Sequence, residues 1–295
     1  MDPVVIKACL NGARGRDKNA QVPWTPSEVA AEAERCAAAG AAIVHIHARS
    51  ETGAVSYDPA WYAEADALIR ARTDLIVNHT TARLPDANIG EVVRYLEGTP
   101  LPVDMVSLNL GAILINGARE GGTRSTLAIP NSYEDIRQTI AACVARGIVP
   151  EPALFDAGFL SHLVMLVEDG LLPKPRWLLL EFGGRWGDGL LVMPGTTRSF
   201  SYMRDCLRDL YPEVAVAAHG YEESVFHIGA LAIAGGDHLR VGFEDRVTLP
   251  NGRPARSNAE FVEWAVMVAN AHGRRPATPA EARALMGLPH TPSPR

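Results

Sequence analysis

His45 and His47 are the side chains in this sequence whose types and spacing most clearly could do chemistry. They lie in an apolar run, residues 42–49, that has the composition of a buried strand. Alternate side chains of a strand lie on the same face, so both imidazoles would point the same way and could bind one metal ion. The alternative is a pair of core histidines held by hydrogen bonds, and the pair alone leaves both interpretations open.

A second polar cluster near the end of the chain supplies an acid. Glu244 follows an apolar run that we predict as the last strand, which in a closed barrel returns to the neighbourhood of the first strands. Two histidines and a carboxylate are a common ligand set for a catalytic zinc that keeps one position for water or substrate. We therefore predict His45, His47 and Glu244 as metal ligands, with His219 and Asp245 in reserve. The alternative for the two acids is a solvated turn.

Arg240 stands four positions before Glu244, and on a strand an even spacing places both side chains on one face. A guanidinium at that position could hold an acid or a substrate carboxylate. The alternative is a surface ion pair, and the spacing leaves the two equally open.

Eight short β-rich runs, separated by segments with helical spacing, predict the elements that position these groups. The runs lie at about residues 4–10, 42–47, 75–80, 105–110, 148–155, 177–182, 214–219 and 239–243. A capping signal at residues 25–28 marks the first helix, and a second one near residue 278 marks a short terminal helix. This order predicts an α/β chain: a single (β/α)8 TIM barrel domain over residues 1–295, with a short C-terminal helical extension. An open doubly wound sheet is the alternative, but residues 10–15 match its glycine-rich turn poorly.

Catalytic groups of a TIM barrel gather where its strands end. The ends of the predicted strands supply, besides the residues named above, Asn11, Arg14, Asn78, Thr80, Ser107, Asn109, Glu151 and Glu181. Several of these lie inside apolar runs, where an unpartnered polar group is costly.

Composition excludes several classes of partner. Net charge is −6, with 28 basic and 34 acidic residues, and basic residues form no run, so we expect no nucleic acid partner. The sequence has neither a long uncharged apolar stretch nor the features of a secretory signal, which predicts a cytoplasmic protein without a membrane partner. Its four cysteines form no Cys-x-x-Cys pair, so we expect reduced, inert thiols.

Residues 39–53, 235–245 and 255–260 resemble the β-keto acid cleavage enzymes, and the similarity extends from residue 23 to about residue 283. The resemblance implies a (β/α)8 barrel with one Zn²⁺, an exchange between a β-keto acid and acetyl-CoA, and the products acetoacetate and a new acyl-CoA. It also implies a homo-oligomer, either a dimer or a tetramer. The site residues that it implies are the metal ligands His45, His47 and Glu244, the general base Asp245 with its partner Arg240, and the hydroxyls of Thr80 and Ser107 near the thioester.

The implied chemistry suits these residue types. A zinc ion would polarise the keto oxygen, and Asp245 could then take a proton from the neighbouring carbon to give an enolate that attacks acetyl-CoA. Thr80, Ser107 and Arg240 would stabilise the oxyanions.

Two departures from the family pattern concern the substrate. Arg14 stands where the amino-substrate enzyme has a glutamate, so we expect an anionic, dicarboxylic β-keto acid such as β-ketoglutarate or β-ketoadipate. The alternatives for Arg14 are solvent or a CoA phosphate. Ala153 replaces a glutamate two residues after Glu151, and His79 or His219 could take part instead, although a structural role is favoured for both. Together with Asn109, Arg14 and Glu151 are the predicted substrate-binding residues.

Two rival functions remain. A zinc-dependent hydrolase of the amidohydrolase type also uses a His-x-His strand, but there the pair lies on the first strand, whereas here it lies on the second. A non-catalytic barrel that binds a CoA ester is the other, and Asp245 beside the metal ligands argues against it, because a binding protein needs no base.

Overall fold

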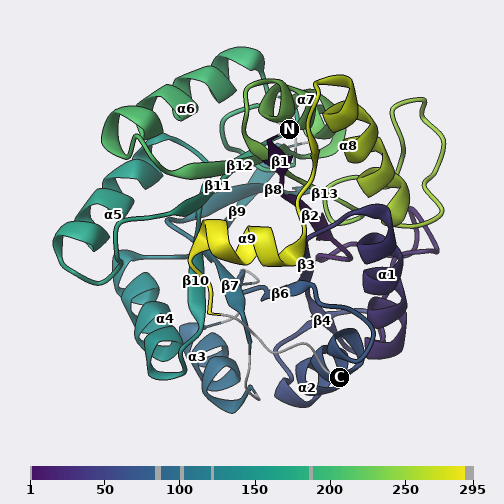
Figure 1. The fold of residues 1–295 in the computed structure, drawn as a ribbon. Helices are drawn as coiled ribbons and strands as arrows, with labels where there is room; N and C mark the ends of the chain where they lie inside the picture. The colour runs from purple at the N-terminus through teal and green to yellow at the C-terminus, as the bar shows by residue number, and fades with distance from the viewer. Residues whose placement is uncertain (1, 84–87, 100–102, 121–122, 186–188, 290–295) are drawn as a thin grey trace.

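Eight parallel strands close into a barrel in the computed structural model, which describes residues 2–83, 88–99, 103–120, 123–185 and 189–289 (Figure 1). Successive barrel strands are neighbours around the ring, and the last pairs with the first. Their bounds are β2 Ile6–Cys9, β3 Ile43–Ile46, β6 Ile76–His79, β7 Met105–Asn109, β10 Val149–Leu154, β11 Trp177–Phe182, β12 Ala215–Gly220 and β13 His238–Val241. All eight predicted runs overlap a barrel strand, so the predicted (β/α)8 barrel is confirmed.

A ring of helices packs against the outside of the barrel (Figure 1). Their bounds are α1 Pro26–Ala39, α2 Pro59–Arg70, α3 Ile89–Gly98, α4 Tyr133–Ala145, α5 Ala157–Glu168, α6 Thr197–Leu210, α7 Val225–Ala234 and α8 Ala259–Ala271, with the short 3₁₀ turn η1 Glu222–Ser224 before α7. The predicted capping box is present at α1, where Thr25 accepts from the Glu28 amide and Glu28 accepts from the Thr25 amide.

Three small two-stranded sheets lie outside the barrel. The first predicted run splits, because β1 Pro3–Val4 pairs with β14 Arg275–Pro276 instead of entering the barrel. After β3, the strands β4 Ala48–Arg49 and β5 Val55–Ser56 form a short hairpin, and after β7 a longer hairpin joins β8 Ile113–Glu120 to β9 Thr123–Ile129. The longer hairpin was not predicted from the sequence.

The N-terminal end of the barrel is closed by α9 Pro279–Met286, the predicted terminal helix, which lies across the barrel in Figure 1. Its residues pack with apolar side chains from the starts of several strands; that cluster includes Val5, Ile43, Ile76, Met105, Trp177, Ala282 and Met286. Arg283 of α9 also pairs with buried Asp104 at 2.8 Å. Because this end is apolar and plugged, the polar chemistry is confined to the middle and the opposite end.

No helix in the described part of the chain is long and apolar enough to cross a membrane. All four cysteines are free, and Cys9, Cys36 and Cys143 are buried. Burial raises the pKa of the Cys9 and Cys36 thiols well above the ordinary value, as expected for inert thiols.

Candidate metal centre and active site

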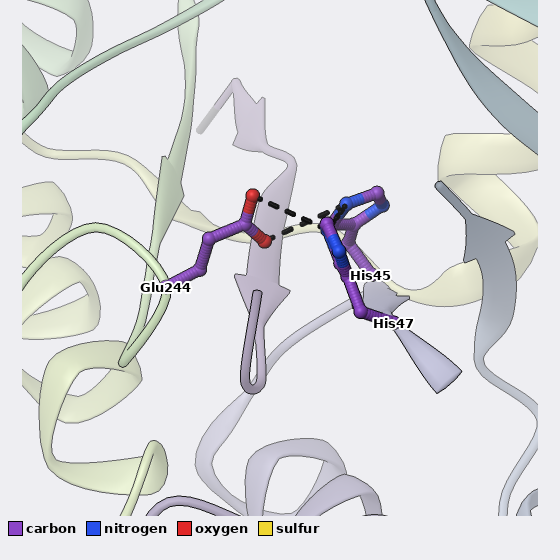
Figure 2. Close-up of side chains that lie close together, drawn as sticks. All are labelled: His45, His47 and Glu244. Atoms are coloured by element: carbon purple, nitrogen blue, oxygen red, sulfur yellow. Dashed lines mark hydrogen bonds and ion pairs between the residues drawn. The ribbon is translucent and has the colours of Figure 1, made fainter. Parts of the chain in front are cut away.

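His45, His47 and Glu244 converge at the C-terminal end of the barrel (Figure 2). The Nε2 atoms of the two histidines are 3.0 Å apart, and the Glu244 carboxylate oxygens lie 3.5 Å from Nε2 of His45 and 3.4 Å from Nε2 of His47. One ligand atom from each residue lies within 4.8 Å of the others. The first and second barrel strands and the loop after the eighth thus meet, as the closed-barrel prediction required.

Backbone contacts hold the metal-ligand candidates in place. His47 lies just past the end of β3, and Asn11 fixes its main chain by accepting from the His47 amide at 3.0 Å and donating to the His47 carbonyl at 2.9 Å. The Glu244 side chain packs against Gly12, where an added Cβ would come within 2.3 Å of Glu244 Cγ. Glycine is needed at that position because any larger residue would displace the carboxylate.

The turn that carries Glu244 depends on Gly242 and Asn258. Gly242 has a φ of 147°, and an added Cβ would lie 2.2 Å from the Cys9 carbonyl oxygen. Buried Asn258 accepts from the Phe243 amide at 2.8 Å and donates to the Leu10 carbonyl at 3.1 Å. Asn258 was not predicted as a positioning residue from the sequence. It lies in one of the stretches that carry the family resemblance, but nothing local indicates its distant partners.

The charge distribution fits a cation between these three side chains. Burial opposes ionisation of Glu244, but Arg240 and the two histidines outweigh it and hold the pKa of that carboxyl well below its usual range. Burial lowers the pKa of His45 well below its ordinary value, so the imidazole is neutral and able to ligate. Glu244 Oε2 is buried without a hydrogen-bond partner among the described residues. A neutral imidazole and an unpartnered carboxylate oxygen suit a divalent metal ion.

Asp245 and Arg240 form a buried pair beside this cluster. Arg240 donates from Nη2 to Asp245 Oδ1 at 2.7 Å and from Nε to Oδ2 at 3.2 Å, and Nη2 also lies 2.7 Å from Glu244 Oε1. Asp245 is 0% exposed and Arg240 is 2% exposed. The interpretations of the acids as a solvated turn and of Arg240 as a surface ion pair are therefore wrong. Arg240 and Glu244 do share a face, although the strand ends at Val241.

A second acid and a histidine support this pair. His219 Nε2 lies 2.9 Å from Glu181 Oε2, and His219 Nδ1 lies 3.6 Å from Asp245 Oδ1. Tyr221 donates to the same Glu181 oxygen at 3.0 Å. Burial raises the pKa of Glu181, but Arg240 and His219 lower it further, so this carboxyl is ionised. His219 is thus bonded within the Asp245 network and is not part of the metal-ligand set.

Thr80 lies just past the C-terminal end of β6, whereas Ser107 is the middle residue and Asn109 the last residue of the neighbouring strand β7. The Thr80 hydroxyl accepts from the Ala82 amide at 3.0 Å, and the Ser107 hydroxyl accepts from the Thr81 amide at 3.4 Å. Thr80 is 0% exposed and Ser107 is 6% exposed. Asn109 is half-buried opposite Ala153 of β10. These residues line the same barrel end as the metal-ligand candidates.

Arg14 lies at the rim of the site and is not a free solvent-exposed side chain. It donates from Nη2 to the Glu244 carbonyl oxygen at 2.9 Å and from Nη1 to Glu222 Oε1 at 2.6 Å. Its side chain is 14% exposed, whereas that of Glu222 is 48% exposed. Glu222 has the left-handed φ of 51°, and its amide donates to the Asp245 carbonyl at 2.9 Å. The rim therefore presents an arginine whose carboxylate partner can be reached from solvent.

Two other candidates lie elsewhere. His79 points out of the barrel towards the surrounding helices, and its ring nitrogens lie 2.5 Å from the Tyr95 hydroxyl and 2.8 Å from Asp66 Oδ1. These contacts support a structural role for His79. Glu151 is buried in the middle of the barrel and accepts from Asn78 at 3.0 Å, from Trp177 at 2.8 Å and from Lys7. Both of its carboxylate oxygens thus accept from protein donors.

A family model described as beta-keto acid cleavage enzyme matches residues 3–288. This chain belongs to the β-keto acid cleavage enzyme family. The resemblance predicted from the sequence is therefore confirmed, as is the prediction that the chain is an enzyme of this kind.

Relatives of this β-keto acid cleavage enzyme differ in their named substrates. The 3-keto-5-aminohexanoate cleavage enzyme of Fusobacterium nucleatum is 30% identical over 98% of this chain and 99% of its own length. The 3-oxoadipate:acetyl-CoA acetyltransferase of Cupriavidus necator is 26% identical over 97% of this chain and 95% of its own length. Relatives of full length thus include one named for an amino-substituted keto acid and one named for 3-oxoadipate.

A solved structure supports the fold of this β-keto acid cleavage enzyme. The apo structure of ObcA matches with a TM-score of 0.73 and 19% sequence identity, covering 91% of this chain and 66% of ObcA. At that identity the similarity concerns the barrel alone.

Proposed function

We propose that this protein transfers an acyl group between a β-keto acid and acetyl-CoA, giving acetoacetate and a new acyl-CoA, with Zn²⁺ bound by His45, His47 and Glu244. The observation that carries the proposal is the convergence of these side chains directly beside the buried Asp245–Arg240 pair. The residue set agrees with family membership, which independently makes the chain an acetyl-CoA-dependent enzyme of β-keto acids.

The bound Zn²⁺ would act as a Lewis acid that lowers the acidity barrier of the carbon between the keto and carboxylate groups. Two imidazoles and one carboxylate leave a position for substrate, as catalytic zinc sites require. An amidohydrolase-type hydrolase is less well supported, because His45 lies on the second barrel strand and not the first.

Asp245 serves as the base in this proposal. Its carboxylate takes a proton from C2 of the β-keto acid, and the C2 electron pair forms a bond to the acetyl carbonyl carbon while the CoA thiolate leaves. The thiolate then attacks C3, the C2–C3 bond breaks, and C2 takes the proton back as acetoacetate departs. Arg240 balances the Asp245 charge while the proton is on the substrate.

Thr80 and Ser107 would donate their hydroxyl protons to the oxyanions that form when each carbonyl carbon is attacked. Their hydroxyl oxygens already accept from backbone amides, which fixes their positions and directs the hydroxyl hydrogens elsewhere. Asn109, at the end of β7 beside them, would contact the substrate.

Arg14 favours a β-keto acid with a second carboxylate, such as β-ketoglutarate or β-ketoadipate. Its guanidinium lies against the backbone of Glu244 at the rim, and a substrate carboxylate could replace Glu222 as its partner. A relative named for 3-oxoadipate supports this substrate class, although the amino-substrate relative is slightly more similar. A cytoplasmic location and a homo-oligomeric state stay predictions from the sequence.

The test is to incubate the zinc-loaded protein with acetyl-CoA and a panel of dicarboxylic, neutral and cationic β-keto acids, and to measure acetoacetate and acyl-CoA. We expect both products in equal amounts, with the dicarboxylic acids fastest. Absence of acetoacetate with every acid would reject the proposed reaction.

A further inference from the structure

A chain of buried polar side chains crosses the barrel interior from the metal-ligand cluster to the opposite wall, and the proposed reaction does not use it. His45 Nδ1 lies 2.5 Å from Asn78 Oδ1, and Asn78 Nδ2 donates to Glu151 Oε2 at 3.0 Å. The same Glu151 oxygen pairs with the Lys7 ammonium, while Oε1 accepts from Trp177 Nε1 at 2.8 Å. His45, Asn78, Glu151 and Lys7 are each at most 1% exposed.

Each link in this chain fixes the orientation of the next. Glu151 Oε2 accepts from the Lys7 ammonium and from Asn78 Nδ2, so the Asn78 group that faces Glu151 is the NH₂. The Asn78 oxygen then faces His45, and because an amide oxygen can only accept, His45 Nδ1 must carry the hydrogen. A neutral imidazole has one N–H, so Nε2 of His45 keeps its lone pair, directed at His47 and Glu244.

We propose that Asn78, Glu151 and Lys7 are positioning residues that set the tautomer and ring orientation of the metal ligand His45. Lys7 holds the Glu151 carboxylate in place, Glu151 sets which way the Asn78 amide faces, and Asn78 fixes the hydrogen on His45 Nδ1. This proposal rests on the metal centre proposed above, but not on the reaction. It assigns Glu151 a role through His45 instead of the substrate contact expected from the sequence.

The row of hydrogen-bonded side chains from His45 to Lys7 explains why a lysine and a glutamate are buried inside the barrel. A lysine and a glutamate buried in a barrel give little net stability compared with apolar residues of similar size. Hydrogen bonds from the distal nitrogen of a metal-binding histidine commonly change metal affinity by 10–100-fold. Orienting His45 for metal binding therefore accounts for the buried Lys7–Glu151 ion pair, which a contribution to stability alone does not explain.

The first test reads the tautomer directly, without metal or substrate. In protein labelled with [¹⁵N]histidine and freed of metal by a chelator, the His45 signals are assigned by their loss in His45→Gln. We expect the Nδ1–H tautomer, with an unprotonated Nε2. An Nε2–H tautomer in the wild-type protein would overturn the proposal.

The second test measures Zn²⁺ affinity by chelator competition and the ligand-field spectrum of bound Co²⁺. Asn78→Leu removes both bonds at similar volume, and we expect its Zn²⁺ affinity to fall about 10–100-fold, with a changed Co²⁺ spectrum. Asn78→Asp is the second variant, because its side chain keeps an oxygen that can accept from His45 Nδ1 but loses the NH₂ that faces Glu151. We expect it to retain more Zn²⁺ affinity than Asn78→Leu.

Tyr95→Phe is the matched control, because it removes an equally buried hydrogen bond to His79, the next residue on the same strand, which faces outward. It should lower stability and leave Zn²⁺ affinity unchanged. A folded Asn78→Leu variant that binds Zn²⁺ as tightly as wild type would contradict the proposal. If Asn78→Leu does not fold, the tautomer of the wild-type protein and the Zn²⁺ affinity of Asn78→Asp test the proposal, and an Asn78→Asp variant without the Nδ1–H tautomer would contradict it. Failure of the wild type to bind Zn²⁺ would instead reject the proposed metal centre.

Discussion

Adjacent acids, Glu244 and Asp245, face different partners, and this difference separates their roles at the residue scale. Glu244 faces the two histidines, whereas Asp245 is bonded to Arg240 and lies near His219. The backbone turn at Gly242 sends consecutive side chains to these two places. Metal binding and proton transfer should therefore be separable by mutation.

We expect Glu244→Ala to lose bound zinc, and Asp245→Asn to keep it while turnover falls about a hundredfold to ten-thousandfold, because the amide cannot take a proton. Zinc content and initial rates measure the two effects. Glu260→Gln, a change in an ion pair with Arg253 and Arg256, is the control. Retained turnover in Asp245→Asn would refute the assigned base.

Arg14→Glu tests the substrate class. The change replaces a cation at the rim with an anion, so we expect kcat/KM to fall at least about tenfold for β-ketoadipate relative to a cationic β-keto acid. Arg16→Glu, a neighbouring exposed arginine paired with Glu28, is the matched control and should not alter the preference. An unchanged substrate preference in Arg14→Glu would show that Arg14 does not select the β-keto acid.

Much of the site was predictable residue by residue. The His-x-His spacing, the acid after the last strand and Arg240 indicated the cluster, because alternation and barrel closure bring them together. The Asn78–Glu151–Lys7 chain was not predictable, since its members contact one another across the barrel. A lysine in the apolar strand Ile6–Cys9 was the one local signal.

At the scale of elements, the loop after β13 is anchored to β2 and α1 through Asn258. The Asn258 side chain forms hydrogen bonds with the backbone of Phe243 and Leu10, and the Asn258 backbone amide donates to Glu32 at 2.9 Å. Loss of these hydrogen bonds should therefore displace Glu244, which is the residue after Phe243.

Asn258→Ala is expected to lower the free energy of unfolding by about 1–3 kcal/mol, because it leaves the buried Phe243 amide without a partner. It should also weaken Zn²⁺ binding. Urea unfolding and chelator competition measure the effects, with exposed Asn251→Ala in the same loop as control. Unchanged Zn²⁺ affinity in Asn258→Ala would show that this anchor does not position Glu244.

His238 makes the joint between β13 and the N-terminal strands sensitive to pH. Its Nδ1 accepts from the Val5 amide at 3.1 Å, which requires a neutral ring, and burial followed by Arg274 lowers its pKa from 6.5 to about 4. Below pH 6.5 the unfolded chain takes up a proton that the folded chain does not, so stability falls until about pH 4 and the loss then levels off.

The stability advantage of wild type over His238→Asn should therefore shrink between pH 7 and pH 4, by on the order of 2–3 kcal/mol. Urea unfolding across this range measures it. Asn251→Ala, which changes an exposed side chain without removing a titratable group, should show a constant difference. A constant difference for His238→Asn as well would mean that His238 is not held neutral.

The eight barrel strands were predictable because both their faces are buried, which gives continuous apolar runs. The β8–β9 hairpin was missed because it lies outside the barrel, where β9 is almost wholly exposed and shows no clear alternation. The split between β1 and β2 was missed because an apolar run does not indicate where a strand changes partner.

At the scale of the whole molecule, the barrel divides its two ends between stability and chemistry. Apolar side chains and α9 fill the N-terminal end, while the metal-ligand candidates lie at the other end. Closure of the sheet is what joins residues from the first and last strands, so the site forms only in the folded chain.

Zinc should therefore stabilise the folded state. At a free Zn²⁺ concentration a hundredfold above its dissociation constant, the gain is about 2.7 kcal/mol, or roughly 5–10 °C in Tm. Thermal unfolding with and without a chelator measures this shift. Glu244→Ala should show little or no shift, and an equal shift in that variant would place the stabilising ion elsewhere.

The most direct test of the central claim is anomalous diffraction at the zinc edge from crystals of the zinc-loaded protein. We expect one peak per chain, bonded to His45 Nε2, His47 Nε2 and a carboxylate oxygen of Glu244, with Asp245 close by but not bonded. A fully active protein without a peak among these three side chains would contradict it.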